Sequence, residues 1–117
     1  MNTSESLAEL LTLPGSKCAA IVDYTSGMIL DSAGTGVDLD VAAAGNTEVV
    51  RAKMKTMEAL KLNDAIEDIL ITLGRQFHII RPCAQHKGLF IYYVVDKSGN
   101  LAMARRKVQE AEIGLKL

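Results

Sequence analysis

The chain has 117 residues, of which 49% are hydrophobic and 4% aromatic, and its 13 basic and 14 acidic residues nearly cancel. This length predicts one domain with a single core, and no apolar run approaches the ~18 residues that a membrane-spanning helix requires. Near-neutral charge without a basic stripe argues against nucleic-acid binding, and so few aromatic residues argue against a platform for stacking bases.

Apolar periodicity predicts helices and strands in the order α-β-β-α-β-β-β-α. Three-four spacing marks the helices, continuous or alternating apolar residues mark the strands, and Gly, Pro and short polar residues mark the breaks. The predicted elements are a helix over 4–13, strands over 17–24 and 28–33, a long helix from 38 or 39 to 62, strands over 67–73, 77–82 and 88–96, and a helix over 101–115.

Capping and turn residues in the first half of the chain support these boundaries. Ser4 is placed to cap the first helix, and Pro14-Gly15 to stop it. The strand over 17–24 is apolar on both faces and is therefore expected to be buried within a sheet. A Thr-Ser-Gly turn ending at Gly27 joins it to the next strand, and Asn63-Asp64 is expected to end the long helix.

The last three strands differ in character. The strand over 88–96 is apolar from Leu89 to Val95 and is expected at the centre of the sheet. The strand over 67–73 alternates, with Ile69, Ile71 and Leu73 on one face, and this pattern favours a sheet edge. An open edge can pair with another chain, so a small α/β domain with this edge and one long helix is a candidate dimer.

The long helix has a polar and an apolar face when residues are placed at 100° per step. The polar face carries Glu48, Arg51, Lys55 and Glu58. The apolar face carries Leu39, Ala42, Ala43, Val49, Val50, Met57 and Leu60, with Met54 at its margin. Asn46 and Lys53 break the pattern, because both point into the middle of the apolar face.

Three interpretations of Asn46 and Lys53 remain open. In the first, Lys53 lays its methylene stem over the core with its ammonium in water, while Asn46 bonds to a nearby loop. In the second, both lie in a helix–helix dimer contact and set its register. In the third, they mark a pocket for a ligand or partner. Charged residues such as Arg51 and Lys55 most often only form the solvent-exposed face of a helix. They are also candidates for contacting a partner protein.

The sequence offers no catalytic or metal-binding constellation. Cys83 and His86 have the spacing of half a zinc site, but the only other cysteine, Cys18, lies far away in a strand expected to be buried. A cysteine nucleophile would need an orienting third group and oxyanion donors. We therefore predict no enzyme, no metal and no cofactor. Two cysteines without a disulfide framework, and a first segment without basic residues, predict a cytoplasmic protein without a signal peptide. His78 is expected at a surface or interface.

Four stretches, together with the order of elements, resemble the roadblock family, most closely its free-standing bacterial members. They are the Asp23-x-x-Ser-Gly27 hairpin and the segments 43–53, 69–82 and 101–105, and the resemblance covers about residues 4–115. It implies a profilin-like, five-stranded antiparallel sheet of order 2-1-5-4-3, with the long helix on one face and the terminal helices on the other. It also implies a homodimer in which the third strands pair across a two-fold axis and the long helices pack side by side.

Members of this family bind or regulate small Ras-like GTPases, scaffold signalling complexes or attach to motor complexes. The resemblance therefore implies a non-catalytic, homodimeric scaffold or regulator with a small GTPase or another bacterial signalling protein as its partner. The predicted dimer interface consists of Ala42, Ala43, Asn46, Val50, Lys53, Met57, Ile69, Ile71 and Leu73. The alternative is a small-molecule sensor in which the small residues 42–45 roof a cavity.

Overall fold

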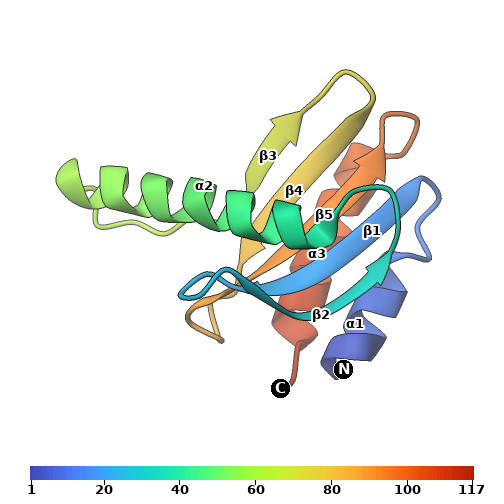
Figure 1. The fold of residues 1–117 in the computed structure, drawn as a ribbon, viewed down its shortest axis with the longest axis horizontal. Helices are drawn as coiled ribbons and strands as arrows, with labels where there is room; N and C mark the ends of the chain where they lie inside the picture. Colours follow the sequence, from blue (N-terminus) through green and yellow to red (C-terminus); the bar gives the residue numbers. More distant parts are fainter.

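The chain folds into three helices and one five-stranded sheet (Figure 1). A computed structural model describes residues 1–117. The elements are α1 (Thr3–Leu10), β1 (Ser16–Asp23), β2 (Met28–Gly34), α2 (Leu39–Ala59), β3 (Ile69–Thr72), β4 (Gln76–Pro82), β5 (Leu89–Asp96) and α3 (Leu101–Gly114). The predicted order of elements is confirmed. None of the helices is both long and apolar enough to cross a membrane.

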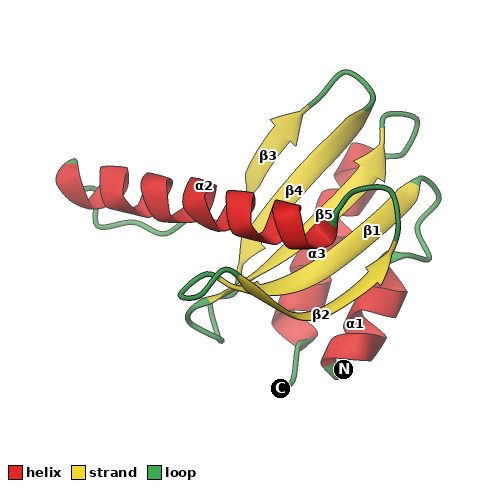
Figure 2. Ribbon diagram, viewed as in Figure 1, coloured by secondary structure: helices red, strands yellow, loops and turns green.

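The sheet is antiparallel throughout and has the strand order β2-β1-β5-β4-β3, as predicted. The helix α2 lies on one face, and α1 and α3 lie on the other (Figure 2). The sheet therefore divides the interior into a larger core of 13 buried residues beside α1 and α3 and a smaller core of 9 beside α2. Because both cores contact β5, every residue from Leu89 to Val95 is buried, which confirms the predicted central strand.

Several element boundaries differ from the predictions. The helix α1 ends at Leu10 and not at residue 13, β3 covers only Ile69–Thr72 of the predicted 67–73, and α3 ends one residue early. Asn2, and not Ser4, caps α1, because its Oδ1 accepts a hydrogen bond from the Glu5 N–H at 2.8 Å while Glu5 Oε1 accepts one from the Asn2 N–H at 3.0 Å. This reciprocal pair begins the helix one residue earlier. The long helix α2 ends at Ala59, three residues before the predicted end at residue 62. Beyond it, Lys61 and Asn63 adopt left-handed backbone conformations, with φ of 56° and 49°. The sequence does not predict this turn at Lys61, because left-handed backbone conformations are typical of glycine and asparagine and not of lysine.

Only part of α2 rests on the sheet. Its first half lies over the sheet and contacts β1 and β2, whereas its second half projects beyond the strands (Figure 1). Its buried residues are Ala43, Thr47 and Val50, so the side facing the sheet is rotated away from the predicted centre at Asn46 and Lys53. The apolar side chains of this helix thus divide between its own core and a lateral surface beside β3.

Candidate interaction site

The strand β3 is an open edge of the sheet. It pairs only with β4, in a regular register that sets Ile69 opposite Ile80 and Ile71 opposite His78. Its other side leaves backbone N–H and C=O groups available to another strand. The strand β2 forms the opposite edge, but a β-bulge interrupts its pairing with β1, and bulges hinder edge-to-edge association. The predicted edge position of β3 is confirmed.

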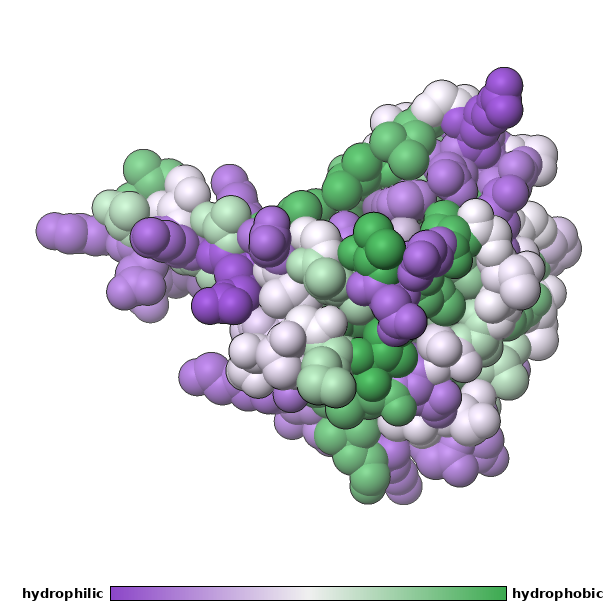
Figure 3. Space-filling model, in the orientation of Figure 1, coloured by the Kyte–Doolittle hydropathy of each residue, from purple (hydrophilic) through white to green (hydrophobic).

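Beside β3, the helix α2 presents a lateral surface that we call the open flank. Val49, Lys53 and Met57 face a hollow of about 710 Å³, the edge hollow, whose far wall is formed by residues 64–69. Helical periodicity places Ala42 and Asn46 on the same flank. Ile69 and Ile71 border it from the strand, where both pack partly against the smaller core. Hydrophobic surface runs along β3 up to this flank (Figure 3).

Two predicted interface residues lie elsewhere. Ala43 and Val50 are 1% and 0% exposed and pack in the protomer's own core against the sheet. They cannot contact a partner unless the protomer opens, so the predicted interface is corrected at these two positions. Val49, which we did not predict there, is 38% exposed on the open flank. Residues 42, 46, 49, 53 and 57 recur at three-four spacing and so lie on one side of the helix, and this spacing predicts Val49 as a member of the flank.

The remaining predicted interface residues lie on or beside the open flank. Lys53 is exposed and Met57 half-buried, both at the edge hollow. Leu73 follows β3 directly and is 39% exposed. The structure therefore brings the corrected set together on one surface, formed by the exposed side of α2 and the free edge of the sheet.

Asn46 takes part in a buried polar contact and does not bond to a loop. It lies close to the hydroxyl of Tyr92, whose other neighbour is His78 Nδ1 at 3.0 Å. Burial raises the pKa of Tyr92 to about 12, and hydrogen bonding by Asn46 opposes this rise. The two rings meet edge to face, with centroids 5.4 Å apart. The off-pattern asparagine thus lies beside a hydroxyl group beneath α2 that His78 also contacts.

His78 carries a buried Nε2 atom with no hydrogen-bond partner. Burial lowers the pKa of this imidazole below 6.5, so the unfolded chain takes up a proton at a higher pH than the folded chain does. The contribution of neutral His78 to the free energy of unfolding should therefore be fully present above the unfolded pKa of ~6.5. It should be lost as the pH falls toward the lower pKa of the folded state. Each unit by which folding lowers the pKa of His78 corresponds to ~1.4 kcal/mol in the free energy of unfolding.

We expect urea denaturation between pH 7.5 and 5 to show this loss in the wild type. In His78→Gln, which keeps a polar group beside Tyr92, the profile should be flatter because the titrating group is gone. His86→Gln is the matched control, since His86 is the only other histidine. If removal of His86 flattens the profile as much as removal of His78, the assignment to His78 is wrong.

Cys83 and His86 do not form a reactive pair. The Nε2 atom of His86 lies 2.9 Å from the carbonyl oxygen of Leu115. Burial, reinforced by the negative charge of Glu112, raises the pKa of Cys83 to about 12, which keeps the thiol protonated at neutral pH and suppresses nucleophilicity. No three His, Cys, Asp or Glu side chains come together in a way that could hold a metal ion.

Arg51 and Lys55 are exposed on α2 and take part in none of the four ion pairs of the structure. Together with Met54 and Glu58 they line a shallow depression. Ala44 and Thr47, on this side of the helix, lie near the turn between β1 and β2 at Gly27. The two cationic side chains therefore point away from the open flank.

The sheet order and the single long helix on one face define a roadblock fold. No family model matches the sequence, and no curated protein matches it either. Solved structures do match. The Roadblock/LC7 domain from Streptomyces avermitilis superposes with a TM-score of 0.83 over 97% of this chain and 93% of that chain, at 10% identity. MglB from Myxococcus xanthus superposes with a TM-score of 0.80 over 95% and 91%, at 15% identity.

A third similar structure is an MglB described in a tetrameric arrangement. Its TM-score is 0.81 over 93% of this chain and 81% of that chain, at 17% identity. At such identities the similarity shows the fold, and the fold is the roadblock fold that the sequence predicted.

Proposed function

We propose that this chain is a non-catalytic scaffold or regulatory module that works as a homodimer. The observation that carries the proposal is the continuity between the free edge of β3 and the open flank of α2. A strand edge supplies backbone hydrogen bonds, and an adjacent apolar helix flank supplies area to bury. The tetrameric arrangement of one similar MglB supports self-association as a use of this fold.

In the proposed dimer the two β3 strands pair antiparallel across a two-fold axis and the two α2 helices lie side by side. Such an interface is self-complementary, because each residue of one copy meets a residue of the other in a reciprocal way. Val49 and Ile71 would supply apolar contacts, while Lys53 would supply a polar group that favours one register. A second copy would give the projecting half of α2 a further surface to pack on.

We further propose that the partner is a small Ras-like GTPase or another bacterial signalling protein. The family resemblance supplies this partner class, and the fold is compatible with it. Arg51 and Lys55 lie away from the open flank, so dimerisation would leave both accessible to a partner. Any stimulation of GTP hydrolysis would then come from ordering the switch residues of the GTPase itself, because no arginine here stands out as a catalytic finger.

The experiment uses the intact chain on a biosensor surface and purified Ras-like GTPases of the source cell, each loaded with GDP or a non-hydrolysable GTP analogue. We expect one GTPase to bind in one nucleotide state, and Arg51→Glu combined with Lys55→Glu to weaken binding at least ~10-fold through charge reversal. Arg106→Glu, on an exposed side chain of α3, is the control and should bind like the wild type. Failure of every such GTPase in both states would remove this partner class.

A further inference from the structure

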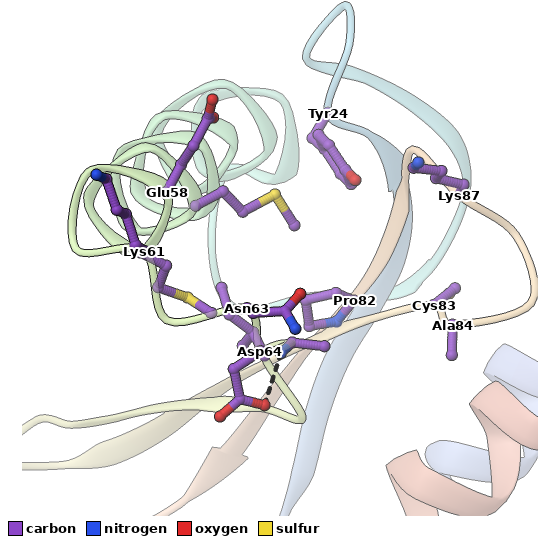
Figure 4. Close-up of a pocket in the computed structure, with 13 residues that line it drawn as sticks. Tyr24, Glu58, Lys61, Asn63, Asp64, Pro82, Cys83, Ala84 and Lys87 are labelled. Atoms are coloured by element: carbon purple, nitrogen blue, oxygen red, sulfur yellow. Dashed lines mark hydrogen bonds between the residues drawn. The ribbon is translucent and has the colours of Figure 1, made fainter.

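A second hollow lies beneath the projecting half of α2 (Figure 4) and adjoins the edge hollow, with which it shares Met57 and residues 64–66. This helix-end hollow measures about 650 Å³, within the size range of small-molecule sites. Its walls come from the end of α2, the returning segment 61–66, the end of β4, Tyr24 after β1 and Lys87 before β5. Residues 42–45, which the sensor hypothesis placed over a cavity, line neither this hollow nor the edge hollow.

The floor of the helix-end hollow is apolar. Seven of its 13 lining residues are hydrophobic, among them Met54, Met57 and Ile66, and the ring of Pro82 adds further apolar surface. The left-handed residues Lys61 and Asn63 return the chain beneath the helix. The hollow therefore depends on two backbone conformations that non-glycine residues adopt only at some cost.

The polar groups that face the hollow can all donate hydrogen bonds. The Lys87 ammonium and the Tyr24 hydroxyl point toward each other on one wall, and the Asn63 amide points inward toward Pro82 (Figure 4). Lys87 takes part in no ion pair. The acidic side chains lie otherwise: Glu58 points out from the helix (Figure 4), and Asp64 accepts a hydrogen bond from the Ala65 N–H at 2.8 Å.

We propose that the helix-end hollow binds a small apolar monocarboxylate. The apolar body would lie over the methionines and Pro82, and the carboxylate would accept hydrogen bonds from Lys87 and Tyr24. Charge-assisted bonds of this kind are the strong ones, and an unpaired ammonium beside an apolar floor complements such a ligand. The hollow shares Met57 with the proposed dimer contact, but Lys87 and Tyr24 do not line the edge hollow, and their ammonium and hydroxyl groups complement a small anion. The proposal goes beyond the scaffold function and stands whether or not a GTPase binds.

Titration of the full chain with dodecanoate, followed by calorimetry below the micellar concentration, tests this site. We expect saturable binding of one molecule per protomer. Dodecanol, which has the same chain without the charge, should bind about 10-fold more weakly, since a hydrogen bond to a charged group contributes more than one tenfold step in affinity. Non-saturable uptake of several molecules, or equal binding of acid and alcohol, would overturn the proposal.

Two variants locate the binding. Lys87→Gln, on an exposed loop side chain, should fold normally and weaken dodecanoate binding about 10-fold while leaving dodecanol binding unchanged. Met54→Glu places a carboxylate on a residue that lines this hollow and not the edge hollow, and should abolish binding of the acid. Lys116→Gln is the control for simple loss of charge. If Lys87→Gln and Lys116→Gln bind dodecanoate alike, the carboxylate is not held where we place it. Unchanged dimerisation of Lys87→Gln separates this result from the proposed scaffold function.

Discussion

Val50→Glu is expected to unfold the protomer, whereas Val49→Glu will leave it folded and remove the dimer. Val50 is 0% exposed and packs in the smaller core between α2 and the sheet. A carboxylate there has no partner and must lose its hydration, which costs several kcal/mol. This cost is comparable to the whole stability of a small domain, ~5–15 kcal/mol. Loss of the cooperative urea transition, followed by circular dichroism, is the expected measurement.

Val49 provides the matched control, because it is the adjacent residue and the substitution is the same. It is 38% exposed on the open flank, so a glutamate there keeps its hydration and the protomer should stay folded within about 1 kcal/mol of the wild type. In the proposed dimer a carboxylate at this position would enter the interface without a partner, and sedimentation should report monomers. A Val49→Glu protein that remains dimeric would place the interface elsewhere.

Ile71→Lys is expected to give monomers that are folded but less stable than the wild-type protomer. Ile71 lies on β3 and packs partly against the smaller core beside the open flank. A lysine there places a charge where the partner's strand and helix should meet, and charged edge residues are a common means by which proteins prevent strand pairing. We expect the dimer dissociation constant to rise at least ~100-fold, because a desolvated unpaired charge costs about 3 kcal/mol or more.

Leu70→Lys separates the effect of position from the effect of a charge on the strand. Leu70 neighbours Ile71 in the same strand but points to the opposite face, where it is 37% exposed. Its lysine can reach water in both the monomer and the dimer, so dimerisation should change less than ~10-fold. Equal weakening by both lysines would mean that the free edge matters and the flank of α2 does not.

The sequence predicted those features that depend on local pattern. Continuous apolar residues from Leu89 to Val95 indicated a central strand, and the alternation around Ile69 and Ile71 indicated an edge; both are found. Periodicity was less decisive for α2, because an apolar stripe does not tell which part faces the protomer's own sheet and which part faces outward. The adjacent valines 49 and 50 fall on either side of that division.

The features that escaped prediction depend on residues brought together from several segments. The contact between Asn46, Tyr92 and His78 joins α2, β5 and β4. The helix-end hollow joins five parts of the chain, including Tyr24 and Lys87. No spacing in the sequence reveals such neighbours, because only the crossing of α2 over the sheet and the turn at Lys61 create them.

Sedimentation equilibrium of the wild-type chain distinguishes the proposed homodimer from a monomer. We expect a reversible dimer of twice the 12.6 kDa chain mass at micromolar concentration, which Val49→Glu and Ile71→Lys convert to monomers and Leu70→Lys does not. A wild-type chain that sediments as a 12.6 kDa monomer throughout the micromolar range would contradict the proposed homodimer.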